Sequence, residues 1–136
     1  MDWLKPTILI GGVILAVFLL KRILFLNATK AQELLRQGAM IIDVRSRGEF
    51  ESGHVPGAIN IPLGELRVLL PTMVADKNEP LLVHCLSGGR SAIAKNQLHA
   101  LGYTQVHNLG SLRRAQQLYR NAKPAGSSDH SNKAGS

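Results

Sequence analysis

A single cysteine opens a segment whose residue types suit a reactive thiol. Cys85 is the only cysteine of the chain, and the run Cys85-Leu-Ser-Gly-Gly-Arg90 places two glycines and an arginine directly after it. Glycines let a backbone curl with its N–H groups turned toward one centre, and arginine adds a full positive charge. Such surroundings lower a thiol pKa from about 8.5, which favours the nucleophilic thiolate. The alternative is an inert buried cysteine before a glycine-rich turn.

The elements that must position this segment alternate between strands and helices. Residues 80–85 form an apolar run that predicts a buried strand with Cys85 at its carboxyl end, and a helix is expected from Ser91 to Leu101. A helix from a Thr29–Gln32 capping box to Gly38 and another over 66–74, broken or kinked by Pro71, are also expected. The remaining expected elements are strands at 40–44, 58–61 and 105–109 and a helix at 112–121. This order predicts an α/β domain with a mainly parallel central sheet, helices on both faces and a site at the strands' carboxyl ends.

Two separated motifs resemble those of rhodanese-like domains. The first is carried by Asp43-Val-Arg45, Glu49-Phe50 and Gly53-His-Val-Pro-Gly-Ala-Ile-Asn-Ile-Pro62, and the second, Val83 to Ser91, resembles the active-site loop of that family. The resemblance covers roughly residues 28–121 and implies the rhodanese-like fold. One departure lies near the C-terminus, where the family often has a Gly-Gly pair followed by tryptophan. Here Gly110-Ser111 and Tyr119 stand instead.

The resemblance implies a sulfurtransferase of the thiosulfate type. In such an enzyme the loop cysteine accepts a sulfane sulfur from a donor such as thiosulfate, carries it as a persulfide and passes it to cyanide, a thiol or a protein acceptor. The resemblance makes Cys85 the nucleophile and assigns the persulfide or donor oxyanion to the loop residues Leu86, Ser87, Gly88, Gly89 and Arg90. It leaves Asp43, Arg45 and Ser91 as candidates for supporting the loop. No cofactor is expected, and no metal site is predicted, because one cysteine and five dispersed histidines show no ligand spacing.

Several titratable residues in and near these motifs favour structural interpretations. Because neighbouring side chains of a strand point to opposite faces, His84 is expected to face away from Cys85 into the core. His54 is expected to pack within a turn. A pairing of Asp43 or Glu49 with Arg45 is expected to be structural and not an acid–base pair.

The N-terminal region predicts a membrane anchor. No charge occurs from Pro6 to Leu20, and after Lys21-Arg22 the apolar run resumes through Leu26, so residues 6–26 are expected to contact lipid. We expect an anchor over 1–27, a domain over 28–123 and a disordered tail over 124–136. A cleaved signal peptide is the main alternative, but the cationic and bulky flank lacks a small-residue cleavage site. A buried core helix is disfavoured because Ile8 to Leu20 is apolar all round.

The distribution of charge and the single cysteine indicate on which side of the membrane the domain lies. Lys21, Arg22, Lys30 and Arg36 follow the apolar segment, so the positive-inside bias predicts a single-pass protein with its C-terminal domain in the cytoplasm. A lone thiol also fits a reducing compartment. The net charge of +7 does not predict nucleic-acid binding, because the basic residues are scattered and the predicted domain holds only three aromatic residues.

Two other functions use comparable residues. Cysteine phosphatases also place a cysteine and an arginine around an anion cradle, but four residues separate Cys85 from Arg90 where the phosphatase loop has five. The shorter loop favours a sulfur atom over a tetrahedral phosphate. A non-catalytic binding module on the same fold at the membrane remains open, because a fold by itself does not establish activity.

Overall fold

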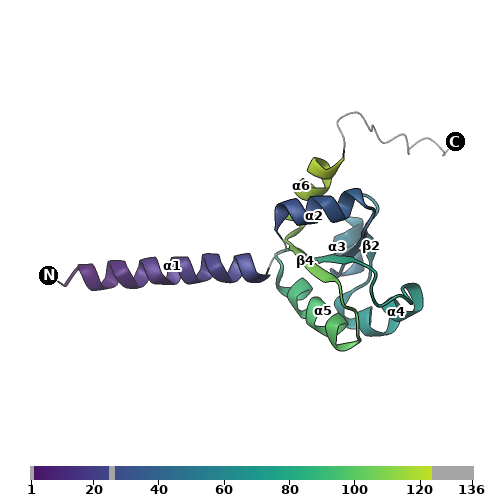
Figure 1. The fold of residues 1–136 in the computed structure, drawn as a ribbon, viewed down its shortest axis with the longest axis horizontal. Helices are drawn as coiled ribbons and strands as arrows, with labels where there is room; N and C mark the ends of the chain where they lie inside the picture. The colour runs from purple at the N-terminus through teal and green to yellow at the C-terminus, as the bar shows by residue number, and fades with distance from the viewer. Residues whose placement is uncertain (1, 25–26, 124–136) are drawn as a thin grey trace.

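A computed structural model of the chain describes residues 2–24 and 27–123 (Figure 1). It consists of an apolar N-terminal helix followed by a small α/β domain. The expected disordered tail over 124–136 and the end of the expected lipid-contacting segment, residues 25–26, lie outside the described residues.

The centre of the domain is a four-stranded sheet in which every pairing is parallel. The strands are β1 (Met40–Asp43), β2 (Ile59–Asn60), β3 (Leu81–His84) and β4 (Val106–Gly110), in the order β2-β1-β3-β4. All four residues of β3 are buried, because this strand has a neighbour on each side and a helical layer on each face. The predicted parallel sheet is confirmed, although β2 is shorter than the expected strand at 58–61.

Helices cover both faces of the sheet, as predicted (Figure 1). On one face, α4 (Leu66–Met73) and α5 (Gly89–Ala100) bury apolar side chains against Val83 and Cys85. On the other face, α2 (Ala28–Arg36) and α6 (Leu112–Ala122) pack against Leu82. Adjacent residues of β3 therefore enter different cores, which follows from the two-residue period of a strand.

Several element boundaries differ from those expected from the sequence. Helix α2 is capped by Asn27, whose side-chain oxygen accepts the Thr29 N–H at 2.9 Å, so the predicted Thr29 capping box is wrong. A helix that was not expected, α3 (Arg47–Glu51), has a reciprocal capping box between Ser46 and Glu49. Helix α5 begins at Gly89, two residues before the expected start at Ser91.

Pro71 does not break α4. A short 3₁₀ turn, η1 (Leu63–Glu65), leads into α4, and Pro71 lies in the last turn of that helix. The chain then leaves the helix at Val74, whose carbonyl accepts the buried Tyr103 hydroxyl at 2.6 Å. Because Pro71 lies in the last turn, only a short stretch of α4 follows it, and the proline does not interrupt the helix.

The N-terminal helix α1 (Leu4–Leu24) has 21 residues and lies outside the α/β domain (Figure 1). At 1.5 Å per residue it measures about 30 Å, the thickness of a bilayer's hydrocarbon core. Its described apolar side chains are exposed, and Lys21 and Arg22 occupy its last turn. By length and composition, this helix is able to cross a membrane.

Candidate active site

Cys85 lies directly after β3, with its side chain directed into the α4–α5 core. The residue is 1% exposed, and its backbone N–H donates to the Gly110 carbonyl at 3.2 Å. This bond continues the pairing of β3 with β4 past the end of the strand. The sulfur is therefore held at the carboxyl edge of the sheet, where parallel α/β proteins place their sites.

The sulfur atom sits at the N-terminal end of α5. The Gly88 N–H donates to Cys85 Sγ at 3.0 Å, and the Ser91 hydroxyl lies 3.5 Å from the same atom. Gly88 is the N-cap of α5 and has a φ of +102°, a conformation that residues with a Cβ rarely adopt. The cap glycine thus turns its amide toward the thiol, and the positive end of a 12-residue helix adds to the field there.

These contacts change the acidity of the thiol. Burial acts to raise the pKa of Cys85, but the Ser91 side chain and the amides of Ser91, Gly88 and Ser87 favour the thiolate. The hydrogen bonds prevail, so the pKa of Cys85 lies below its ordinary value. A lowered thiol pKa is the direction that an activated cysteine requires.

The loop after Cys85 is tied to the segment that follows β4. Ser87 forms an antiparallel bridge with Ser111, and the Leu112 N–H donates to the Leu86 carbonyl at 3.2 Å. The Leu86 side chain itself is 54% exposed. The loop backbone is therefore fixed while an apolar side chain faces solvent next to Cys85.

Asn108 supports the loop and was missed by the sequence analysis. This buried residue of β4 accepts the Ser91 hydroxyl at 2.7 Å and the Gly110 N–H at 2.8 Å, and its amide lies 3.4 Å from the Gly88 carbonyl. It thus joins the start of α5, at Gly88 and Ser91, to the end of β4 at Gly110. The available signal was an amide side chain within a mostly buried strand, which needs hydrogen-bond partners.

Arg90 forms an ion pair that the sequence did not predict. Its two terminal nitrogens donate to the two carboxylate oxygens of Glu49 at 2.8 and 2.9 Å, and both side chains are about one-third exposed. This bidentate pair holds the pKa of Glu49 far below its usual range. Glu49 therefore pairs with Arg90, and the alternative pairing with Arg45 is wrong.

Asp43 and Arg45 form a separate, fully buried pair at the end of β1. Arg45 donates to both Asp43 oxygens at 2.7 to 3.0 Å and to the Gly53 carbonyl at 2.7 Å. Among the described residues, their side-chain hydrogen bonds run to each other and to Gly53, not to the Cys85 loop. These contacts place the pair on the segment that carries α3 and Glu49, and an Asp43 oxygen also lies 3.6 Å from Nε2 of His84, the residue before Cys85.

Comparison with known proteins agrees with this geometry. A family model described as the rhodanese-like domain matches residues 27–114, which is more than half of the chain. The chain belongs to the rhodanese-like family. It is 46% identical over 72 residues to thiosulfate sulfurtransferase PspE of Escherichia coli, covering 53% of this chain and 69% of that protein. It is 32% identical over 80 residues to thiosulfate sulfurtransferase GlpE of Pseudomonas syringae, covering 59% and 74%.

Solved structures show the same fold. The human single-domain sulfurtransferase TSTD1 superposes with a TM-score of 0.59 at 29% identity, covering 69% of this chain and 96% of that chain. A rhodanese with anions from Escherichia coli superposes with a TM-score of 0.54 at 43% identity, covering 56% and 89%. The rhodanese-like resemblance read from the two sequence motifs is therefore confirmed.

The two histidines near the motifs of this rhodanese-like domain have structural contacts. His84 faces away from Cys85, with Nδ1 3.2 Å from the Cys85 carbonyl and Nε2 3.6 Å from an Asp43 oxygen. Burial is the main cause that lowers the pKa of His84, so the ring is neutral at pH 7. His54 stacks on Phe50 with ring centroids 3.7 Å apart, which is the turn packing predicted for it.

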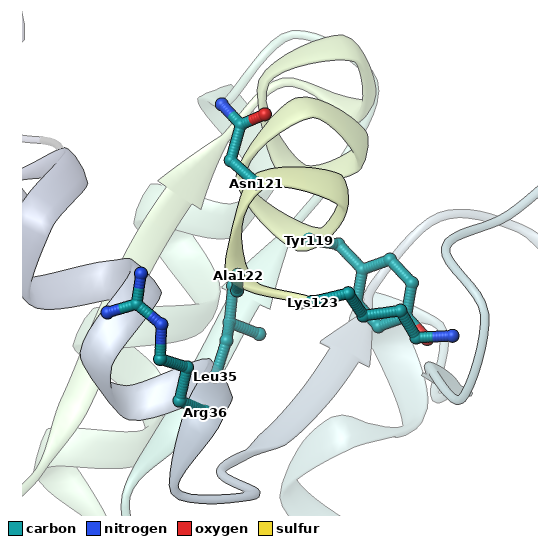
Figure 2. A pocket seen from close by; sticks show the side chains of 6 residues that line it. All are labelled: Leu35, Arg36, Tyr119, Asn121, Ala122 and Lys123. Atoms are coloured by element: carbon teal, nitrogen blue, oxygen red, sulfur yellow. The ribbon is translucent and has the colours of Figure 1, made fainter. Parts of the chain in front are cut away.

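A cavity of about 750 Å³ lies apart from the thiol of the rhodanese-like domain, at the C-terminal ends of α2 and α6 (Figure 2). Its lining includes Leu35 and Arg36 of α2, and the Lys123 ammonium lies 5.1 Å from the centre of the Tyr119 ring. None of the loop residues lines it. Within residues 2–24 and 27–123, no three cysteine, histidine or acidic side chains gather as a metal site.

Proposed function

We propose that this chain moves a sulfane sulfur through a persulfide on Cys85, as a rhodanese-type sulfurtransferase. The observation that carries the proposal is the Gly88 N–H placed 3.0 Å from Cys85 Sγ at the start of α5. A thiolate favoured by these hydrogen bonds is the nucleophile that sulfur transfer requires. The names of the PspE and GlpE relatives support thiosulfate as a donor.

The reaction divides into two displacements at sulfur. The Cys85 thiolate attacks the sulfane sulfur of thiosulfate, a new S–S bond forms, and the bond to the sulfonate sulfur breaks with release of sulfite. The persulfide then carries its negative charge on the outer sulfur, beside the amides of Ser87 and Gly88. Attack on that sulfur by cyanide or by an acceptor thiolate releases thiocyanate or a new persulfide and regenerates the Cys85 thiolate.

The test is the mass of the intact protein after thiosulfate and again after cyanide. We expect a gain of one sulfur atom followed by its complete loss as thiocyanate. Cys85→Ser is expected to show neither step, because a hydroxyl cannot carry a persulfide, whereas Ser87→Ala keeps the loop amides and serves as the control. Thiocyanate formation by the Cys85→Ser variant would overturn the proposal.

We also propose that α1 anchors the domain to a membrane as a single-pass helix, with the domain on the cytoplasmic side. The 21 apolar-rich residues of α1 and the Lys21-Arg22 pair in its last turn support a span. The cations that follow, Lys30 and Arg36 on α2, support the orientation under the positive-inside rule. Helix α2 begins at Ala28, so the short link after Leu24 keeps the start of the domain close to the membrane surface.

Fractionation and protease protection test the anchor. The full chain is expected to stay in the membrane pellet after alkaline washing, and a shortened chain starting at Asn27, the cap of α2, is expected to be soluble. Protease added to intact cells should spare the domain. Digestion from outside, or recovery of a mature chain without α1, would refute this placement.

A further inference from the structure

Helix α2 begins at the edge of the sheet that carries the Cys85 loop. Between the end of α2 and the start of β1 the chain turns back, and the Ala39 N–H donates to the Leu34 carbonyl at 3.0 Å. Because this turn is short and Leu34 packs against the sheet, α2 runs antiparallel to β1 and to the other strands. Helix α2 therefore ends at the amino edge of the sheet, where the strands begin. Its cap Asn27 lies at the carboxyl edge, as Cys85 does.

The packing of α2 on α6 leads to the same placement. The two helices lie next to each other in Figure 1, and their C-terminal ends line one cavity in Figure 2, through Leu35 of α2 and Ala122 of α6. The helices have nine and 11 residues, so their N-terminal ends also lie close together. Helix α6 is capped by Ser111, which bridges to Ser87 of the Cys85 loop. The start of α2 thus lies next to a helix start that is bonded to this loop.

The N-terminal helix joins the domain at this edge. Asn27 is the third residue after Leu24, the end of α1, and an extended chain spans at most about 11 Å over three residues. The amino edge lies further from α1 by the length of α2, which is about 13 Å for its nine residues. With α1 across a bilayer, the carboxyl edge is the part of the domain held nearest to the lipid headgroups.

The side chains exposed near this junction are apolar and basic. Leu86, the first residue of the loop, is 54% exposed. Lys30 in the first turn of α2 and Arg113 in the first turn of α6 are also exposed. The last turn of α1 adds Lys21 and Arg22. An apolar side chain flanked by cations suits the surface of an anionic bilayer.

The acidic side chains of the carboxyl edge do not cancel this charge. Glu49 pairs with Arg90 at 2.8 Å, and Glu51 pairs with Arg47 at 3.0 Å. Glu65 belongs to η1, which follows β2, the strand at the opposite end of the sheet from β4. The charge near the starts of α2 and α6 is therefore positive, which is complementary to anionic lipids.

We propose that the carboxyl edge of the sheet docks on the surface of the membrane that α1 crosses, with Leu86 among the headgroups and Lys30 and Arg113 against anionic phosphates. The inference rests on the proposed membrane anchor and does not depend on sulfur transfer. It assigns an anionic lipid surface as the partner of the surface around the Cys85 loop. In the docked state the loop faces the bilayer, so reactants dissolved in the headgroup layer reach the thiol without leaving the membrane surface.

The first test places a tryptophan at each edge of the full chain in turn. Trp3→Phe removes the only native tryptophan, and Leu86→Trp in that background reports on the carboxyl edge. Met73→Trp is the matched control, because Met73 is 48% exposed at the end of α4, before the turn into β3 at the amino edge. In phosphatidylcholine–phosphatidylglycerol vesicles with brominated acyl chains, the emission of Leu86→Trp should fall by about half or more, because an interfacial side chain lies near the acyl chains. The emission of Met73→Trp should stay unchanged.

The two cations give a second, quantitative test. Each basic residue near an anionic surface changes the docking equilibrium by about fivefold. Lys30→Gln with Arg113→Gln, in the Leu86→Trp chain, should therefore lower the ratio of docked to undocked protein by about 25-fold. Arg36→Gln with Arg120→Gln is the matched control, because it removes one cation from the last turn of each of the same two helices. This control should leave the quenching unchanged.

Hydrogen exchange of the unmodified chain avoids the new tryptophan. The amides of residues 86–90 should exchange more slowly in vesicles that contain phosphatidylglycerol than in phosphatidylcholine alone, whereas residues 74–79 should show no difference. Equal quenching at the two edges, quenching of Met73→Trp alone, or exchange that ignores the lipid charge would overturn the proposal. Protection that grows with the number of chains per vesicle would assign the edge to a second copy of the chain, and would also overturn it.

Failure of the anchor gives a different result. In that case alkaline washing removes the full chain from the vesicles, and the docking falls together with the anchor. Retention after washing with unquenched Leu86→Trp would overturn the docking alone. Neither readout uses sulfur transfer, so a Cys85 that carries no sulfur would refute that function and leave both results on docking intact.

Discussion

Removal of the Ser91 hydroxyl is expected to slow the reaction of Cys85 at neutral pH without unfolding the domain. The hydroxyl is fully buried and lies 3.5 Å from Cys85 Sγ, 3.0 Å from the Gly88 carbonyl and 2.7 Å from the Asn108 oxygen. Its side chain leads the causes that favour the Cys85 thiolate. Ser91→Ala deletes this donor and leaves every backbone amide of the loop in place.

The magnitude follows from one hydrogen bond to a charged sulfur. The single Ser91 proton is shared among Cys85 Sγ, the Gly88 carbonyl and the Asn108 oxygen, so its loss costs the thiolate at most about 1 kcal/mol, or up to about a fivefold lower acid dissociation constant of the thiol. A more basic thiolate is also intrinsically more nucleophilic, which reduces the net loss of rate to about two- to threefold. The cost in stability is small, because Asn108 keeps its bond to the Gly110 N–H and no buried donor is left unpaired.

The assay is the rate of reaction of the lone thiol with a neutral aromatic disulfide as a function of pH. Ser91→Ala should be slower than the unmodified protein at neutral pH and faster on the high-pH plateau, so the two profiles cross. Ser87→Ala is the control, because Ser87 acts on the thiol through its backbone amide. Coincident profiles, or a Ser91→Ala profile moved to lower pH, would refute the hydrogen-bond argument.

Three further changes have defined outcomes. Arg90→Ala should lower kcat/KM for thiosulfate with little change in melting temperature, because it removes a positive charge next to the loop at a part-exposed site and leaves the Glu49 carboxylate without its partner. Comparable losses of stability and activity would indicate a structural arginine. Tyr103→Phe should lower the free energy of unfolding by about 1–2 kcal/mol without changing sulfur transfer, since it leaves the Val74 carbonyl unpaired; denaturant unfolding measures this. Because burial lowers the pKa of His84, the unfolded chain takes up the proton first, and stability should fall as pH decreases below about 6.5. An unchanged slope in His84→Gln would assign the effect to other groups, such as His107, whose pKa burial also lowers.

The parts of the structure that depend on local pattern were predictable from the sequence. The runs at 40–44 and 80–85 are apolar enough to specify buried parallel strands, and the glycines after Cys85 indicate a tight strand-to-helix loop. Competition between two possible capping residues explains the wrong prediction for the start of α2. The Thr29–Gln32 pattern predicted a capping box, but Asn27 stands two residues earlier and caps the helix itself.

The contacts that support the site depend on distant segments, which local spacing does not specify. Asn108 reaches Ser91 because the register of β4 beside β3 places it under the start of α5, 17 residues away in sequence. Glu49 was part of a recognisable motif, yet its partner lies 41 residues further on, and nothing in the spacing separates Arg45 from Arg90 as that partner. The sequence thus indicated which residue types are reactive, whereas their pairing required the fold.

Sulfur transfer through Cys85 can be tested by the intact mass of the full chain after brief exposure to thiosulfate. Because Cys85 is the only cysteine, any persulfide on a cysteine is assigned without peptide mapping. We expect a mass increase of one sulfur atom that cyanide removes with release of an equal amount of thiocyanate, and no increase in Cys85→Ser. An unmodified mass in folded protein, or thiocyanate production that survives in Cys85→Ser, would contradict it.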